Sequence, residues 1–141
     1  MAARRSLSTL SPAALRFAGW PGSPQHEFLA EERWEHAYGR NRVYEHGHHG
    51  NALLSRFPIL STENQDVSDS RFERRGLLHT VVAVPGWRRN LHCICVHLSL
   101  HERGRGRQLD AIGARLEALA QTDAPIIVAG DFNDWRQRAT R

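Results

Sequence analysis

The sequence predicts an α/β domain with mixed strand pairing, and three observations support this fold class. Two apolar runs, at 77–84 and 91–98, are separated by a short loop that begins with Pro85 and Gly86, which favours an antiparallel hairpin. A stretch with helical spacing of apolar residues follows, and a third apolar run begins at residue 126. This order of strand, hairpin, helix and strand is typical of an α/β layer architecture.

The first quarter of the chain predicts little regular structure. Residues 1–25 are rich in Arg, Ser, Ala and Pro and contain no acidic residue, so we expect a disordered or poorly packed leader there and a domain over 26–141. Residues 26–37 carry Phe28, Leu29 and Trp34 among charged residues, which indicates a short helix. Residues 38–50 are polar and glycine-rich, so we expect a loop.

The remaining elements follow from apolar patterning. Residues 51–55 indicate a strand, and 61–72 a polar connection. The helix is expected from about residue 105 to 121, because four apolar residues repeat there on one face. These residues are Leu109, Ile112, Leu116 and Leu119.

Composition limits the classes of protein that the chain can belong to. With 141 residues, 40% hydrophobic and 24% charged, it is long enough for one globular domain with a core. No apolar stretch approaches the roughly 18 residues of a membrane-spanning helix. All 19 basic residues are arginine and the formal charge is +4, which favours an anionic partner, although a genome-wide arginine bias explains the composition equally well.

The two cysteines are predicted to be reduced core thiols. Cys93 and Cys95 lie two residues apart in an apolar strand, so both should face the same side. A disulfide between such close neighbours would be strained. Reduced thiols fit a cytoplasmic setting.

The segment at 126–135 carries the clearest chemical signal. Its β-branched start predicts a strand buried on both faces, and Gly130 allows backbone or ligand to approach closely. Asp131 and Asn133 would point the same way in an extended chain, which suits polarising a water beside a phosphate. The same pair also suits a plain turn or a helix N-cap.

Three other polar segments each allow a functional and a purely structural interpretation. His97 ends its strand, where it can bind phosphate or simply hydrogen-bond a backbone carbonyl. Arg74 and Arg75 precede a strand and can clamp phosphate, or form a solvated turn. The histidine-rich run at 45–50 offers zinc or nickel ligands, but nothing is spaced to complete a four-ligand structural site, so a solvated loop is the preferred interpretation.

Four blocks occur together and in order: GNALLSR at 50–56, RRG at 74–76, HL at 97–98 and GDFND at 130–134. In this combination the chain resembles the endonuclease/exonuclease/phosphatase family of the DNase-I-like superfamily, over about residues 26–136. The resemblance implies a four-layer α/β sandwich, with two central mixed sheets flanked by helices.

The resemblance also implies an activity, namely Mg²⁺-dependent (or Mn²⁺-dependent) hydrolysis of a phosphodiester or phosphomonoester, with a nuclease among the possibilities. By position, Asp131 would orient the attacking water, and Asn133 would contact the phosphate or support that aspartate. His97 would contact the phosphate. Asn51 and Arg75 would support substrate binding.

The departures from the family pattern matter as well. Family members usually carry a strand ending in a Gln-Glu pair whose Glu binds the metal, and a final Asp-His pair that supplies the general base. Neither pattern is found, so no metal ligand is assigned, and we expect a fragment, a partial domain with little activity of its own. The alternative function is a non-catalytic basic module that binds nucleic acid or another phosphorylated partner.

Overall fold

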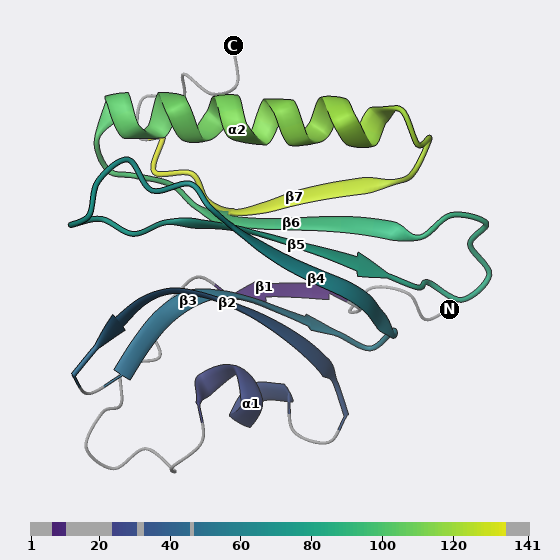
Figure 1. Cartoon of the computed structure of the whole chain (residues 1–141). Helices are drawn as coiled ribbons and strands as arrows, with labels where there is room; N and C mark the ends of the chain where they lie inside the picture. Colours follow the sequence, from purple (N-terminus) through teal and green to yellow (C-terminus); the bar gives the residue numbers. More distant parts are fainter. Residues whose placement is uncertain (1–6, 11–23, 31–32, 46, 135–141) are drawn as a thin grey trace.

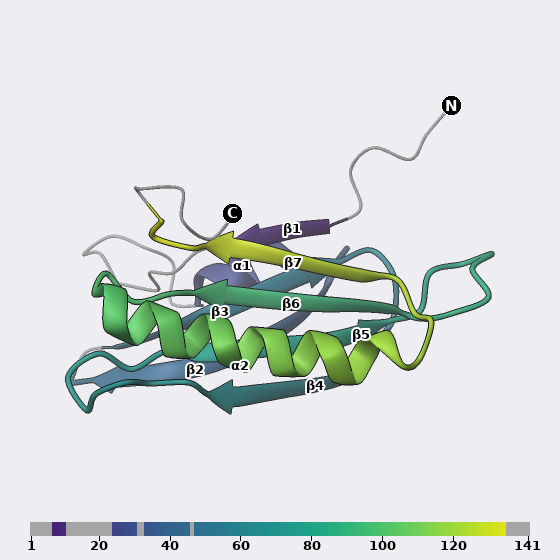
Figure 2. The same ribbon diagram turned by 90° about the horizontal axis from the view of Figure 1, so that it is seen from above.

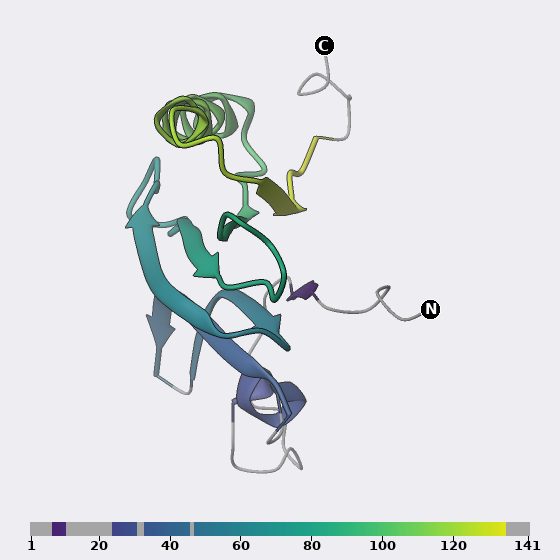
Figure 3. The same cartoon turned by 90° about the vertical axis from the view of Figure 1, so that its right-hand side faces the viewer.

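A computed structural model describes residues 7–10, 24–30, 33–45 and 47–134. Helix α2, two β-sheets and helix α1 are stacked as four layers (Figure 1), which Figure 3 shows from the side. The sequence-based expectation of a four-layer α/β sandwich is therefore confirmed, although only the larger of its two sheets is mixed. The elements are β1 (Leu7–Leu10), α1 (Gln25–Ala30), β2 (Glu35–Tyr44), β3 (Gly47–Ser55), β4 (Ile59–Asp66), β5 (Gly76–Val82), β6 (Leu91–His97), α2 (Glu102–Ala120) and β7 (Ile126–Asp131).

The two sheets differ in how their strands pair. The smaller sheet has the order β1-β3-β2 and is antiparallel throughout. The larger sheet has the order β4-β5-β6-β7, in which β4, β5 and β6 pair antiparallel and β6 pairs with β7 in parallel. The parallel pair requires a crossover, and α2 provides it. The predicted hairpin of β5 and β6 is confirmed.

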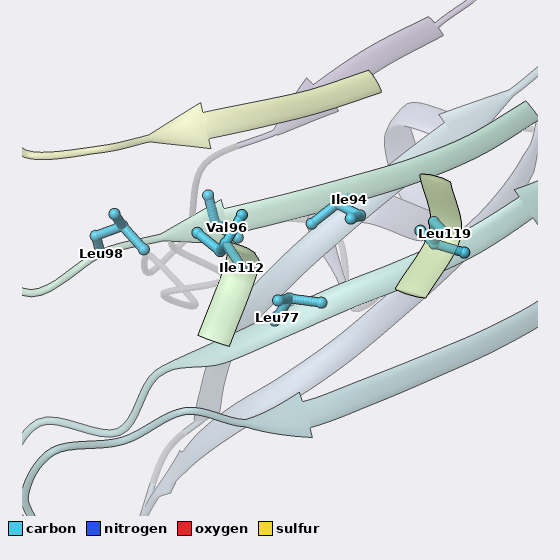
Figure 4. Close-up of a cluster of buried hydrophobic side chains, with 6 residues drawn as sticks. All are labelled: Leu77, Ile94, Val96, Leu98, Ile112 and Leu119. Atoms are coloured by element: carbon cyan, nitrogen blue, oxygen red, sulfur yellow. The ribbon is translucent and has the colours of Figure 1, made fainter. Parts of the chain in front are cut away.

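Helix α2 covers the outer face of the larger sheet (Figure 2). The apolar stripe predicted from the sequence is the face that packs, since all four of its residues belong to the core between α2 and the sheet. Burying each such side chain contributes about 1.5–3 kcal/mol. Figure 4 shows the buried members of this core, which are Leu77, Ile94, Val96, Leu98, Ile112 and Leu119.

A second core fills the space between the two sheets. Leu53 of β3 packs there against Val82 and Cys93 of the larger sheet. Both cysteines are buried and free, as predicted, and burial raises the pKa of each thiol to about 11. Such thiols stay protonated and act as small apolar side chains.

The prediction of a loop over 38–50 is wrong, because this segment forms most of the β2–β3 hairpin. Its glycines permit close packing. A Cβ at Gly50 would lie 1.9 Å from the backbone oxygen of Gly39, and a Cβ at Gly39 would lie 2.3 Å from Oδ1 of Asn64. Glycine at these positions therefore indicates strands whose backbones pack closely against neighbouring residues, and not the loop that a glycine-rich sequence predicts.

Other boundaries in the first half also differ from the expectation. The helix expected over 26–37 ends at Ala30, and β2 begins at Glu35. The connection expected over 61–72 contains most of β4, a largely exposed edge strand whose polar sequence hid it. Within the expected leader, residues 7–10 pair with β3 as β1, and residues 1–6 and 11–23 lie outside the described residues.

Strand β7 is not buried on both faces as predicted. It lies at the edge of the larger sheet, and Ile127 is 41% exposed. Gly130 does allow the close backbone approach that was expected. Its φ is +143°, and a Cβ there would lie 1.8 Å from the backbone oxygen of Val96 on β6. Among the described helices, none combines the length and hydropathy that a membrane-spanning helix requires.

The contact at Gly130 predicts a large effect of a single methyl group. Gly130→Ala adds a Cβ against rigid backbone at a positive φ, so we expect the free energy of unfolding to fall by about 2 kcal/mol or more. Urea unfolding followed by circular dichroism measures this change.

Gly113→Ala is the matched control, because a Cβ at this position in α2 meets nothing within 4 Å. This variant should gain about 0.5–1 kcal/mol from the higher helix propensity of alanine. A Gly130→Ala chain as stable as the parent would show that β7 does not lie this close to β6.

Candidate active site

The carboxyl ends of β6 and β7 bring His97 and Asp131 together. The two residues are register partners in the parallel pair, and Nε2 of His97 lies 3.9 Å from Oδ2 of Asp131. This separation is too long for a hydrogen bond, so neither atom satisfies the hydrogen-bonding capacity of the other. The Asp131 side chain is 48% exposed and that of His97 is 19% exposed, so the pair is open to solvent from the Asp131 side.

Asn133 takes a different position from the one expected for an extended chain. Its φ is 48°, which turns the backbone directly after β7. Its backbone N–H donates to Oδ1 of Asp131 at 2.9 Å, and its side-chain Nδ2 donates to the Leu98 carbonyl at 2.7 Å. The amide is therefore used to hold the strand ends together, and its backbone N–H orients the Asp131 carboxylate.

Asn51 lies at the centre of β3 and connects the two sheets. Its Nδ2 donates to the carbonyl of Gly76 at 2.7 Å and to that of Cys95 at 3.1 Å. Only 1% of the residue is exposed, and its Oδ1 has no hydrogen-bond partner among the described residues. An orphaned buried acceptor of this kind is costly unless it has a functional use or a bound partner.

Arg75 is fixed by the carboxylate of Glu73, a residue that the sequence analysis did not single out. Nη2 of Arg75 lies 2.9 Å from Oε1 of Glu73, and the Arg75 side chain is only 11% exposed. The same carboxylate accepts hydrogen bonds from the Ser99 hydroxyl and from the backbone N–H of Leu100. Glu73 thus ties Arg75 to the segment that follows His97. Arg74 instead forms an exposed ion pair with Asp66.

The electrostatic surroundings keep His97 neutral near pH 7. Burial, and then the nearby Arg75 guanidinium, lower the pKa of His97, and the Asp131 carboxylate opposes them less strongly. Burial and Arg75 also lower the pKa of His49, which places His49 of β3 close to this group. In the sequence His49 belongs to the histidine-rich run at 45–50. Only the alternation of side chains along β3 shows that it lies near Arg75 and His97.

The two described histidines of the run at 45–50, His48 and His49, point to opposite faces of β3 and so do not share one metal site. His48 lies 2.8 Å from the Tyr38 hydroxyl through its Nδ1, whereas the next residue along β3, His49, faces the opposite way, toward Arg75. His46 lies outside the described residues. Within the described ranges, the structure brings Asn51, Arg75, His97, Asp131 and Asn133 to one end of the larger sheet, and their chemical roles stay predictions.

The sequence matches the model of the "Endonuclease/Exonuclease/phosphatase family" over residues 7–141. The "Uncharacterized protein YbhP" of Escherichia coli K12 is 47% identical over 126 residues, which cover 89% of this chain and 49% of that protein. The chain therefore spans about half the length of the curated relatives it matches.

Solved structures agree in fold. The human Nocturnin catalytic domain, solved with a sulfate anion, superposes with a TM-score of 0.68 at 17% identity, covering 91% of this chain and 51% of that one. The D. rerio TDP2 structure with a single-strand DNA product gives a TM-score of 0.64 at 21% identity, covering 82% of this chain and 45% of that one.

The buried histidines predict that acid destabilises the chain. Burial is the largest cause of a lowered pKa at four histidines, so each binds protons more readily in the unfolded chain. Stability should therefore fall as the pH drops below about 6.5, the ordinary histidine value. We expect a lower urea midpoint at pH 5.5 than at pH 7.5, and a smaller difference in His97→Gln. The four are His26, His49, His79 and His97.

The test uses phosphate-free buffer, so that anion binding does not contribute. A midpoint that stays constant or rises toward pH 5.5 would show that these imidazoles are not buried as described.

Proposed function

The chain belongs to the endonuclease/exonuclease/phosphatase family, and we propose that its His97–Asp131 pair takes part in hydrolysis of a phosphate ester. One observation carries the proposal. The Nε2 of His97 and Oδ2 of Asp131 face each other across 3.9 Å at the ends of adjacent parallel strands. A water or a phosphate group bound beside the pair can contact both side chains, and open α/β sheets place their sites at this end of their strands.

The two residues would act on different atoms. The backbone N–H of Asn133 holds the Asp131 carboxylate in place. The carboxylate would accept a hydrogen bond from the attacking water and so orient a lone pair of the water oxygen toward phosphorus. The neutral His97 imidazole donates one N–H to a phosphate oxygen, where negative charge develops. A donor already in place costs no reorganisation when that charge appears.

Arg75 and Glu73 would support this step from the side. The guanidinium keeps Nε buried without a hydrogen-bond partner among the described residues, while Nη2 is held by Glu73. Arginine donors of this kind match phosphate oxygens in geometry and charge. We propose that Arg75 contacts the phosphate and that Glu73 positions it.

Enzymes of this family generally use divalent metals, and we propose Mg²⁺, with Mn²⁺ as a substitute. Mg²⁺ takes oxygen ligands, and the half-exposed carboxylate of Asp131 is available here, whereas Glu73 is engaged by Arg75 and Ser99. One carboxylate with phosphate oxygens and waters fits a weakly held Mg²⁺. The bound ion would neutralise charge on the phosphate.

The substrate class we propose is a phosphodiester or phosphomonoester, with nucleic acid as the first candidate. The net charge of +4, carried entirely by arginine, favours an anionic polymer. Salt dependence distinguishes the candidates, because a polyanion held by several arginines loses affinity steeply with ionic strength and a small ester does not.

Asp131→Asn provides the direct test. We expect slow Mg²⁺-stimulated hydrolysis of bis(p-nitrophenyl) phosphate or p-nitrophenyl phosphate by the chain, and a loss of about 100-fold or more in the variant, because the amide orients water poorly. His97→Gln should fall by a similar factor. Chelation by EDTA should remove the activity of the parent.

Asp110→Asn is the matched control, since this exposed aspartate lies on α2, outside the candidate site. Its rate should equal that of the parent. Equal turnover in Asp131→Asn, or no turnover with any metal, would contradict the proposal. Salt-sensitive DNA binding without cleavage would then support the non-catalytic basic module.

A further inference from the structure

A second group of possible ligands lies on the opposite face of the smaller sheet. His26 and Glu27 of α1 and His36 of β2 offer one ligand atom each, and these atoms all lie within 4.8 Å of one another. Helix α1 covers the face of the β1-β3-β2 sheet that is turned away from the larger sheet (Figure 1). The group is therefore separate from the His97–Asp131 pair, which lies at the end of β6 and β7.

The surrounding side chains hold His26 in a defined orientation. Its ring stacks on Tyr38 with centroids 4.2 Å apart and planes 3° from parallel, and it meets the His36 ring edge-on at 5.3 Å. The Tyr38 hydroxyl is fixed in turn by Nδ1 of His48 at 2.8 Å. His26 is only 7% exposed, whereas Glu27 and His36 are exposed. The group thus has one preorganised imidazole and two ligands that can adjust.

We propose that His26, Glu27 and His36 bind a zinc-type transition-metal ion that fastens α1 to β2. Two imidazoles and a carboxylate form a donor set that suits Zn²⁺ and is too rich in nitrogen for Mg²⁺. Zinc bonds to nitrogen and oxygen are about 2.0–2.2 Å long, so tetrahedral ligand atoms lie closer together than 4.8 Å. Rotation of the exposed Glu27 and His36 side chains closes this difference, and a water takes the fourth position.

Electrostatics agree with this assignment. Burial, followed by the neighbouring His36, lowers the pKa of His26, so the ring is neutral at pH 7 with a lone pair available for a metal. Glu27 supplies the negative charge that a bound cation requires. His79 and His92 also lie close together, but Nε2 of His79 and Nδ1 of His92 are 2.9 Å apart and share a hydrogen bond. These two nitrogens therefore already have a partner in each other.

The sequence alone did not indicate this group. His26 and His36 are ten positions apart in the chain, and the dense run at 45–50 drew attention instead. Helix α1 packs against β2 in the fold, and this packing brings the two histidines together. A metal bond between the helix and β2 would add a direct link within this layer and so stabilise it.

The experiment uses the 141-residue chain without an affinity tag, freed of metal with a chelator. Titration with ZnCl₂, followed by calorimetry, should show one ion bound per chain. Saturating zinc should raise the melting temperature by roughly 5–8 °C, and Mg²⁺ at the same concentration should not. His36→Ala and Glu27→Gln should each weaken zinc binding about tenfold or more and reduce the thermal shift.

Both substituted side chains are exposed, so the variants are expected to fold. His101→Ala and Glu117→Gln are the matched controls, because they remove an exposed histidine and an exposed glutamate elsewhere on the surface. Each should bind zinc as the parent does. Absence of saturable binding, or binding that both cluster variants retain, would overturn the proposal. Binding lost only in Asp131→Asn would do so too, by assigning the ion to the other site.

Discussion

The parallel pairing of β6 with β7 is the constraint on which the candidate site depends. Its register sets His97 opposite Asp131, and the absence of a side chain at Gly130 lets the two backbones approach. The turn at Asn133 then closes the end of the pair by bonding both Asp131 and the Leu98 carbonyl. Neither polar group could hold its position if β7 were shifted by one residue, since alternate residues face opposite sides of the sheet.

The buried side-chain amide of Asn51 connects the smaller sheet to the larger sheet near this site. It donates to carbonyls of two different strands of the larger sheet, so the smaller sheet is held by directional bonds as well as by apolar packing. His49 and Arg75 also lie close to His97, where the two sheets meet. Below it, α1 covers the other face of the smaller sheet with its own histidine group. The four layers thus separate two chemically different regions, one rich in groups that suit phosphate and one rich in imidazole.

Much of the second half of the chain could be predicted from its sequence, because apolar periodicity there reflects burial directly. The stripe from Leu109 to Leu119 and the runs that became β5 and β6 are examples. In the first half the apolar run at 51–55, which lies within β3, could be predicted in this way, but most of the rest could not. Polar edge strands such as β4 carry no apolar pattern, and glycines that permit close packing at Gly39 and Gly50 resemble those of a loop. Site residues such as Glu73 and His49 act through contacts distant in sequence, which local patterns do not record.

A double-mutant cycle on His97 and Asp131 tests whether the two residues act on the same phosphate. If both groups act on one phosphate, hydrolysis rates of the parent, His97→Gln, Asp131→Asn and the double variant should be strongly non-additive. We expect the double variant to be no slower than the slower single variant, within about threefold. Fully additive losses, in which the two effects multiply, would mean that the residues act independently and would contradict it.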